Sequence, residues 1–574
     1  MLALVVLLLA VRLVMVQGIS PVALADRTGV QGIRPIIVAA ERGRLLDRNG
    51  NELALSVNAT NLTANPHAIA ALTCPPTSTT PCSAAAIAAV VAPLLALPEA
   101  DVLAKLTSDK GFVYLKRGLD PAAAQKVLDL NLPGISYERS TRRLHPSHDL
   151  AAGVLGFTDF DGLGVAGVEK MMQGQLAGKA GRTVARFDAA GRVIPTSGES
   201  RVDPIDGKDV ELTLDRDLQW YAQRLIADQV QATGARNGSV VVMDVKTGEV
   251  LALATAPTFD PDNRTGSALM GNPAISDVYE PGSVNKVITA AAALQDGIVT
   301  PATVIEVPST YQVSNTVLHD AEKHGLERLT FAGVLAKSSN IGTVKVAQQV
   351  GPQRLYDMMR SFGFGTKSGL GLPGESDGHI PSPSNWSGTS IANIPIGQGI
   401  SVNVMQVASV YATIANGGIR VEPSILRSVL DHAGHRTSAE APLRKRVIPP
   451  EVALSLRTML EQVVGEQGTA PKAAIPGYRV AGKTGTAQRV AVDGPRAGKY
   501  DGTYTSSFIG MAPADSPRFV TAVVLQGTGA RGYFGGQVAA PLFSKIMGFA
   551  LRAYSVAPSG TSAPVLRLSA DNPR

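Results

Sequence analysis

The first 19 residues constrain this chain more than any other stretch, because they determine on which side of a membrane the rest can fold. Residues 1–19 are almost continuously apolar, with Arg12 and Gln17 as interruptions. A helix of about 20 apolar residues spans the hydrocarbon core of a bilayer. We therefore predict a single anchor helix over 1–19 in the lipid bilayer of the cell membrane, with the rest of the chain on the extracytoplasmic side. A cleaved signal peptide is the alternative, since residues 23–25 resemble a cleavage site.

The two cysteines agree with export. Cys74 and Cys82 flank a short segment of proline, threonine and serine. A disulfide between them would close a surface loop and would suit an oxidising compartment, whereas two unpaired thiols are the alternative. Metal sites usually need more ligands, and the eight histidines do not cluster near this pair. We predict no metal site and no cofactor.

Length and charge limit the class of protein further. With 574 residues the chain is long enough for at least two domains. Its net charge of +6 is spread along the sequence and forms no basic block. No nucleic-acid partner is therefore expected.

The pattern of apolar residues changes near residue 206. Residues 84–131 carry helical spacing, and residues 142–182 are rich in glycine, which favours loops and close backbone packing. After residue 206, apolar runs around short turns predict two β-hairpins, at 239–255 and 504–527, with helical segments between them. Strands at both ends of a helical region predict an α+β domain, an antiparallel sheet covered by helices.

These changes divide the chain into four predicted segments. The anchor at 1–19 is followed by an N-terminal non-catalytic domain at 20–205 and a catalytic domain at 206–555. Residues 556–574 are rich in serine, alanine and proline, a composition typical of a flexible tail.

A serine and a lysine three residues apart follow a chain break at Pro281 and Gly282. A helix that begins near Ser283 would place Lys286 on the same face. A serine becomes a good nucleophile when a base takes its proton, and a lysine whose pKa is lowered by burial can be that base. A capping serine beside a solvated lysine is the alternative, because about two Ser-x-x-Lys patterns are expected by chance in a chain of this composition.

Ser-x-Asn occurs four times, beginning at Ser56, Ser283, Ser338 and Ser401, so the pattern alone carries little information. The copy at Ser338 differs because it interrupts two apolar helical segments. A polar break between buried helices tends to direct its side chains into a cleft. Ser338 is therefore a candidate for relaying protons, and Asn340 is a candidate for binding a substrate amide.

Lys-Thr-Gly occurs twice. The copy at 246–248 lies at the predicted tip of the first hairpin, where Thr-Gly is ordinary turn chemistry, and we assign it a structural role. The second copy, at 483–485, follows an apolar strand.

The second copy has the residues of a carboxylate-binding strand. Gly485 leaves the strand without bulk, so a ligand backbone could pair against it. Lys483 would supply positive charge, and the hydroxyls of Thr484 and Thr486 would donate to a carboxylate. The backbone amides of Ser283 and Thr486 could together form an oxyanion hole.

Taken in order, these motifs resemble the triple signature of the serine penicillin-recognising enzymes. Further stretches resemble class B penicillin-binding proteins, and one of them most resembles the septal, division-specific branch, the penicillin-binding protein 3 type. The stretches are ERGRLLDRNGNELA, GFTDFDGLGVAGVEK (the septal one), GSVVVMDVKTGEVLALATAPTFDPDN, YEPGSVNK, LAKSSNIGT, GYRVAGKTGTAQ and YFGGQVAAPLF. One departure is Val284-Asn285, where Thr-Phe or Thr-Val is commoner in the family. Packing is expected to differ there while the chemistry survives.

The resemblance implies a penicillin-binding transpeptidase fold preceded by an elongated N-terminal dimerisation or pedestal domain. It implies the catalytic residues Ser283, Lys286, Ser338, Asn340 and Lys483. Ser283 would attack the penultimate carbonyl of a peptidoglycan stem peptide ending in D-Ala-D-Ala and expel the last residue. An amine of a neighbouring stem would then take the acyl group. β-Lactam antibiotics would acylate the same serine as inhibitors.

No stretch of the chain resembles a glycosyltransferase domain, so the resemblance also implies a membrane glycan polymerase and other divisome proteins as partners. Three alternatives stay open. The acceptor could be water, as in a D,D-carboxypeptidase or a β-lactamase. The enzyme could serve cell elongation. The chain could be a β-lactam sensor or a divisome scaffold with little turnover, which the intact motif residues disfavour.

Overall fold

The C-terminal part of the protein is organised around one five-stranded sheet. The computed structural model describes residues 33–73, 81–187, 193–194, 201–264, 270–491, 495 and 497–571. The sheet has the order β11-β10-β22-β21-β20, and all its neighbours are antiparallel. Its strands are β10 (Asn237–Asp244), β11 (Val250–Ala256), β20 (Ala481–Val490), β21 (Tyr500–Ala512) and β22 (Phe519–Thr528). Both predicted hairpins are present, as β10–β11 and β21–β22.

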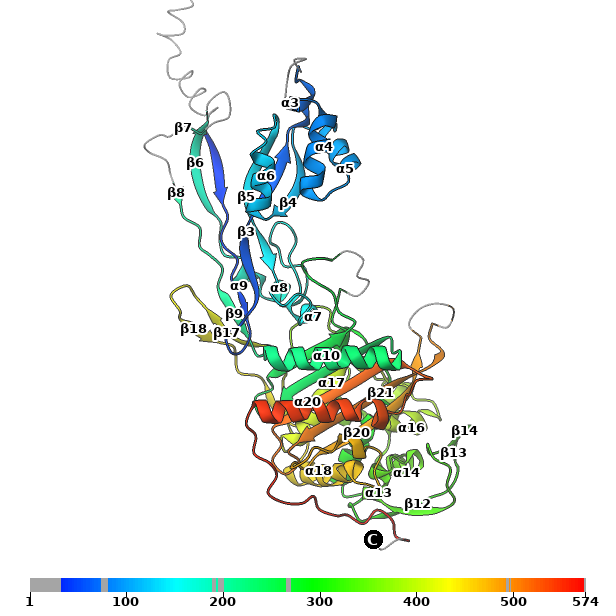
Figure 1. Ribbon diagram of the computed structural model, residues 1–574. Coiled ribbons are helices and arrows are strands. Elements are labelled where there is room, and N and C mark those ends of the chain that lie inside the picture. Colours follow the sequence, from blue (N-terminus) through cyan, green and yellow to red (C-terminus); the bar gives the residue numbers. More distant parts are fainter. Residues whose placement is uncertain are drawn as a thin grey trace, which may run out of the picture.

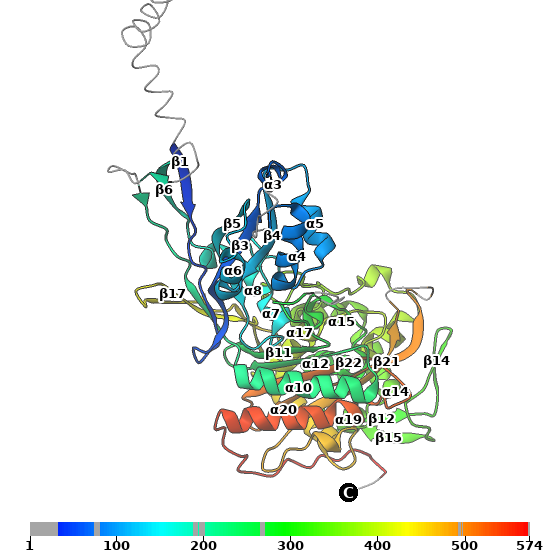
Figure 2. The same cartoon turned by 45° about the horizontal axis from the view of Figure 1, so that its top comes forward.

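The sheet is buried on both faces. Every residue of β10 and β11 is buried, which matches their continuous apolar runs. One face is covered by α10 (Arg216–Thr233) and α20 (Ala540–Ala553), which lie side by side in Figures 1 and 2. Asp215 caps α10, because its Oδ1 accepts from the amides of Asp217 and Leu218 at 3.1 Å.

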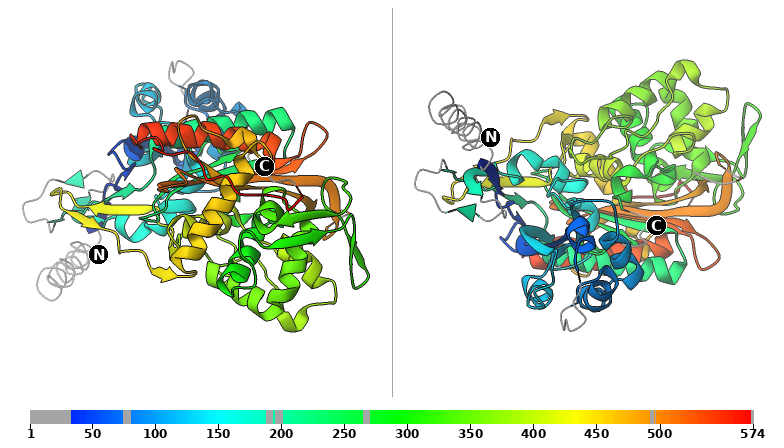
Figure 3. Two further views of the ribbon diagram at one scale, coloured as in Figure 1. Left: turned by 90° about the horizontal axis from the view of Figure 1, so that it is seen from below. Right: turned by 90° about the horizontal axis from the view of Figure 1, so that it is seen from above.

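The other face is covered by helices from the middle of the sequence. Helix α17 (Val404–Ala415) is buried at every position, so it is apolar all round and packs against β10, β21 and β22. Around it lie α12 (Lys286–Gln295), α13 (Phe331–Ala336), α14 (Asn340–Val350), α15 (Pro352–Phe362) and α18 (Pro450–Val464). Figure 3 shows the sheet between the red helix α20 and this yellow and green layer. The predicted α+β architecture is confirmed.

The N-terminal part is built on the long strand β3 (Glu52–Ala64). It pairs with β4 (Val113–Leu119) and β5 (Ile135–Leu144). The helices α4 (Ala84–Leu95), α5 (Glu99–Leu106) and α6 (Pro121–Leu128) enclose a small core against these strands. The region 84–131, predicted from helical spacing, therefore also contains a strand, β4, which adds to the sheet because its edge-to-edge pairing with β3 outweighs local propensity.

The two parts share backbone hydrogen bonds. Strand β2 (Leu45–Leu46) pairs with β3 and, in parallel, with β9 (Asp209–Leu212). Strand β9 in turn pairs with β17 (Leu426–Leu430) of the C-terminal part, so one seven-stranded sheet joins both parts. Strands β1 (Ile33–Val38) and β6 (Gly181–Phe187) pair antiparallel and form a separate arm beside the unit of β3, β4 and β5 in Figure 1.

Some predictions fall on residues that the structure does not describe. The predicted anchor at 1–19 lies outside the described residues, and none of the helices within the described ranges is long and apolar enough to cross a membrane. Cys82 is disulfide-bonded, but Cys74 also lies outside the described residues.

Residues 556–571 differ from the flexible tail that their composition predicts. The segment runs along the C-terminal part from the end of α20 to β15 (Glu327–Thr330), as the red trace in Figure 1 shows. The carbonyl of Leu568 accepts from the amide of Thr330 at 3.0 Å, and its side chain is buried. The amide of Ala570 donates to the carbonyl of Arg328 at 2.7 Å. One buried leucine and paired backbone groups hold the segment in place. The overall composition of the segment reveals neither of these contacts.

Candidate active site

Ser283 lies on a one-turn 3-10 helix, Gly282–Asn285, that leads directly into α12. The turn requires glycine at 282, where φ is +61° and an added Cβ would lie 3.0 Å from the Cβ of Ala487. Ser283 is partly exposed while its neighbours Gly282 and Val284 are buried. Within the part of the chain that the structure describes, the Ser283 hydroxyl has no hydrogen-bond partner that would compete for its proton.

Two buried side chains hold this turn in place. The hydroxyl of Tyr411, from α17, donates to the carbonyl of Val284 at 3.0 Å. The amide of Asn285 donates to the carbonyl of Ile394 at 2.9 Å. Asn285 is one of the two residues that depart from the family pattern, and here it anchors the turn to a neighbouring segment.

Lys286 is fully buried at the start of α12. Its Nζ donates to the carbonyl of Ser338 at 2.6 Å, to the hydroxyl of Ser338 at 3.2 Å and to Oδ1 of Asn340 at 2.7 Å. Burial lowers the pKa of Lys286 from 10.5 to about 7, although the charge of Asp320 acts in the opposite direction. A large fraction of Lys286 is therefore neutral near pH 7 and able to accept a proton.

Ser338 and Asn340 occupy the break between α13 and α14, as the sequence predicts. Ser338 has a left-handed backbone, with φ at +60°. A serine rarely adopts this conformation, so the surrounding contacts must compensate for its cost. The strained turn directs both the carbonyl and the hydroxyl of Ser338 to Lys286.

Asp320 organises this break, a role that no motif in the sequence predicts. Its Oδ1 accepts from the amides of Asn340 at 2.6 Å and Ile341 at 3.0 Å, and its Oδ2 accepts from the hydroxyl of Ser339 at 2.6 Å. The carboxylate thus satisfies the free amides at the start of α14, where the helix dipole favours negative charge. Asp320 belongs to a long connection, and no local pattern links it to the helix that it caps.

Lys483 is fully buried on β20, the edge strand of the sheet. Burial first, and then the charge of Lys286, hold the pKa of Lys483 well below its ordinary value. Each lysine disfavours the charged form of the other, because two buried positive charges repel. Protonation of one lysine therefore makes the other a stronger acid. The pKa values of the two lysines are therefore coupled.

The three residues after Lys483 lie against the Ser283 turn. An added Cβ on Gly485 would lie 3.1 Å from the carbonyl oxygen of Pro281 and 2.3 Å from Oγ of Ser507, so glycine is needed for this close approach. Thr484 exchanges a 2.7 Å hydrogen bond with Thr469, which sequence reasoning did not identify. The hydroxyl of Thr486 accepts from the amide of Gly535 at 3.1 Å.

The first Lys-Thr-Gly lies elsewhere. Lys246 and Thr247 belong to the turn between β10 and β11, where their amides donate to Oδ1 of Asp244 at 2.9 and 3.2 Å. Strand β11 forms the opposite edge of the sheet from β20. The position of this copy agrees with its assignment to turn chemistry.

The arrangement brings together a hydroxyl, a partly neutral ammonium group and a second cation beside an edge strand. Within the described ranges no cluster of histidine, cysteine and acidic side chains is suited to hold a metal ion. The groups suffice for acyl transfer through a serine, because a base, a nucleophile and a cation for a carboxylate are all in place.

Comparison with known proteins agrees with this chemistry. Residues 238–548 match the penicillin-binding protein transpeptidase domain, and residues 37–212 match the penicillin-binding protein dimerisation domain. The chain is 40% identical to the penicillin-binding protein PbpB of Mycolicibacterium smegmatis, over 99% of this chain and 91% of the relative. It is 36% identical to the peptidoglycan D,D-transpeptidase FtsI of Escherichia coli, over 95% of this chain and 89% of the relative.

The fold is likewise similar to a solved structure. Penicillin-binding protein 3 of Mycobacterium tuberculosis, complexed with ampicillin, superposes with a TM-score of 0.72 at 35% identity, over 93% of this chain and 100% of that one. The predicted resemblance is confirmed. The chain belongs to the class B penicillin-binding proteins of the septal type, with a dimerisation domain followed by a transpeptidase domain.

Proposed function

We propose that Ser283 is the residue through which this septal peptidoglycan D,D-transpeptidase forms its acyl-enzyme. The observation that carries the proposal is the buried Lys286, three residues after Ser283, whose Nζ is bonded to Ser338 and Asn340 and whose pKa is lowered to about 7. A lysine in that state accepts the proton of a neighbouring hydroxyl.

The first half of the reaction forms an ester. Neutral Lys286 takes the Ser283 proton as Oγ attacks the penultimate D-alanine carbonyl of a stem peptide. The amides of Ser283 and Thr486 receive the negative charge that develops on the carbonyl oxygen. The proton then passes through the Ser338 hydroxyl, which contacts Nζ of Lys286 at 3.2 Å, to the nitrogen of the leaving D-alanine. The carbon–nitrogen bond breaks, and the acyl group remains on Ser283.

The second half repeats these steps in reverse with a new amine. An amino group of a neighbouring stem attacks the ester, its proton returns to Ser283, and the cross-link is released. β-Lactams enter the first half only. The nitrogen that leaves the opened β-lactam ring remains attached to the acyl group and stays in the site. The acceptor amine therefore cannot attack the ester, and the acyl group stays on Ser283.

The terminal carboxylate of the substrate sets the charges of the two lysines. Its approach to Thr484, Thr486 and Lys483 favours the charged form of Lys483, whose pKa burial otherwise lowers. A charged Lys483 in turn favours neutral Lys286. Substrate binding therefore places the proton on the lysine that binds the carboxylate and frees the lysine that acts as the base.

The proposed segments are the anchor at 1–19, the N-terminal domain at 20–205, the catalytic domain at 206–555 and the tail at 556–574. The matched ranges of the two family domains support this division. The anchor would hold the enzyme in the cell membrane beside a glycan polymerase and other divisome proteins, with the catalytic domain outside the cytoplasm.

Intact-mass analysis after reaction with a fluorescent penicillin tests the nucleophile. Ser283→Ala should abolish the adduct, and Ser276→Ala, at the end of the short helix Pro273–Ser276, should form it normally. A labelled Ser283→Ala variant would refute the assignment. Depletion of the protein in cells tests its role: filaments support septal synthesis, and rounded cells would indicate elongation.

A further inference from the structure

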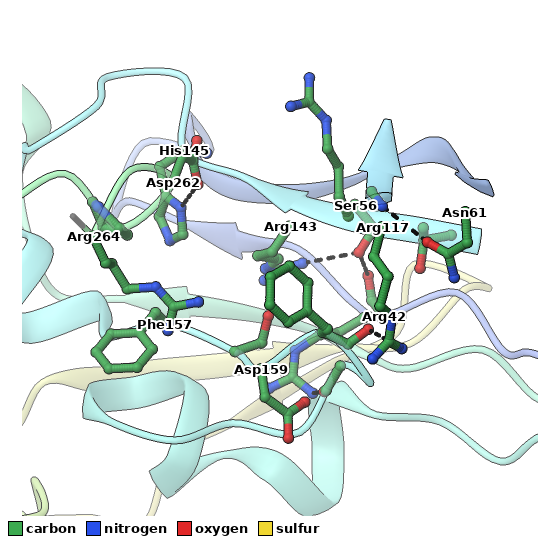
Figure 4. Close-up of a pocket in the computed structure, with 17 residues that line it drawn as sticks. Arg42, Ser56, Asn61, Arg117, Arg143, His145, Phe157, Asp159, Asp262 and Arg264 are labelled. Atoms are coloured by element: carbon green, nitrogen blue, oxygen red, sulfur yellow. Dashed lines mark hydrogen bonds and ion pairs between the residues drawn. The ribbon is translucent and has the colours of Figure 1, made fainter. Parts of the chain in front are cut away.

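A cavity of about 220 Å³ is lined by residues of both the N-terminal and the C-terminal part, and Ser283 is not among them (Figure 4). Most of its wall comes from β3, β4, β5 and the glycine-rich loop after β5, and the rest comes from residues after β11. Five arginines line it, against two aspartates. They are Arg42, Arg117, Arg142, Arg143 and Arg264, with Asp159 and Asp262.

One side of the cavity rests on a buried ion cluster. Glu169 is fully buried and accepts from Nε of Arg42 and Nε of Arg143, each at 2.7 Å. One carboxylate thus faces two guanidinium groups. Burial lowers the pKa of Arg143 although Glu169 opposes the shift, which shows how poorly this charge is solvated. The cluster presents an uncompensated positive charge next to the cavity.

Several donors at the cavity lack partners. Nη2 of Arg143 and Nε of Arg117 are buried without a hydrogen bond, on side chains that line the wall. Such groups have lost water without gaining an acceptor, so an acceptor placed against them removes that cost. The side chain of Arg142 is exposed and, within the described residues, makes neither a hydrogen bond nor an ion pair, although its charge helps to lower the pKa of Asp262.

The acidic residues are already engaged. Oδ1 of Asp159 accepts from two amides of its own loop, at 2.9 and 2.8 Å. Asp262 accepts from the amide of His145 at 2.9 Å and faces its Nδ1 at 2.7 Å, and these bonds, against the effect of burial, hold the pKa of Asp262 below its ordinary value. Asp161 pairs with Arg117. Asp159, Asp161 and Asp262 therefore already have hydrogen-bonding or ionic partners.

We propose that this cavity binds an oxyanion, a carboxylate or phosphate group carried on a compact apolar or ring-shaped body. Arginine forks match both oxyanions. The cavity is smaller than a typical ligand pocket of about 300–1,000 Å³, so it accommodates one such group and not a long chain. Phe160, on the same wall, is 68% exposed and offers an apolar surface to the body that carries the anion.

Binding here would act across the junction between the two parts. Arg42 and Arg143 come from the N-terminal part, whereas Asp262 follows β11 of the C-terminal part and is held by His145. An oxyanion that contacts Arg143 on the N-terminal wall and Arg264 on the C-terminal wall would add a bond between the two walls. It should therefore raise the melting temperature of the full chain as well as bind saturably.

Calorimetric titration of the full chain with inorganic phosphate, phenyl phosphate and benzoate tests the proposal. Phenyl phosphate should bind more tightly than inorganic phosphate because its ring contacts Phe160. Benzoate shows whether a carboxylate is accepted equally well. Arg142→Gln should weaken binding about tenfold, the usual effect of losing one charged partner. Labelling of Ser283 by penicillin should be unchanged, which shows that the variant is folded.

The matched control is Arg139→Gln, because Arg139 is exposed on the same strand, β5, and does not line the cavity. It should bind the three probes as the original protein does. The proposal is overturned if none of the probes binds saturably to the original protein, or if Arg139→Gln weakens binding as much as Arg142→Gln.

Discussion

At the scale of single residues, the site depends on two lysines that are both removed from water. Lys286 is held by three acceptors, whereas the hydrogen bonds of Lys483 within the described ranges are long, at 3.4 Å to the carbonyl and to the hydroxyl of Thr484. The poorer bonding of Lys483 leaves its ammonium group available for a substrate carboxylate. The two copies of Lys-Thr-Gly are not equivalent, because Lys483 is buried whereas Lys246 is solvated at a turn.

The two copies provide a matched test. Lys483→Ala should slow acylation by penicillin by a factor on the order of 10²–10³, because it removes a preorganised cation from a site shielded from water. Lys246→Ala should leave the rate within about twofold, as surface substitutions usually do. Stopped-flow measurement of the second-order acylation rate checks both variants. Equal losses would mean that the wrong copy was assigned.

The lowered pKa of Lys286 predicts a pH dependence. The base is active when it is neutral, so the acylation rate should rise with pH around the pKa of about 7 and level off above it. Asp320 raises the pKa of Lys286, so Asp320→Asn should move the midpoint to lower pH while the asparagine still caps α14. The acylation rate of the original protein and of Asp320→Asn, measured as a function of pH, tests this prediction. An unshifted midpoint would count against Lys286 as the titrating base.

At the scale of elements, the sequence predicted the parts that local patterns encode. Both hairpins of the central sheet and the helix–break–helix around Ser338 follow from apolar periodicity and turn residues. Strand β4 and the Asp320 cap did not follow, because each depends on a partner distant in sequence. The position of Lys286 against Ser338 was predicted from motif order, whereas its depressed pKa required the burial that only the fold supplies.

The segment after α20 gives a test at this scale. Leu568 is buried against the C-terminal part, whereas Val565 is 91% exposed in the same segment. Leu568→Ala should lower the free energy of unfolding by about 2–5 kcal/mol, as for other buried leucines. Val565→Ala should have almost no effect. Chemical denaturation of both variants measures the two effects. If the segment were not docked, both substitutions would leave the free energy of unfolding unchanged.

At the scale of the whole molecule, the two parts are joined by the seven-stranded sheet, and the N-terminal part holds the buried cluster of Arg42, Arg143 and Glu169. A buried ion pair does not by itself stabilise a protein, because desolvation offsets the attraction. Breaking it is different, since the remaining charges stay buried without a counterion.

Glu169→Gln should therefore destabilise the protein by about 3–5 kcal/mol, because two guanidinium groups lose their only shared carboxylate. Glu466→Gln, at an exposed position, is the control and should be neutral. Thermal unfolding followed by circular dichroism measures both. A Glu169→Gln variant as stable as the control would show that Arg42 and Arg143 do not need the carboxylate.

The pairing of β9 with both β2 and β17 has a practical consequence for dissecting the enzyme. A fragment that starts at residue 206 would retain β9 and β17 but lose β2, and a row of backbone donors and acceptors would then face water. Exposed edges of this kind recruit strands from other molecules. An isolated catalytic fragment should therefore associate with itself unless the short segment containing Leu45 and Leu46 is supplied, fused or added as a peptide, to complete the ladder.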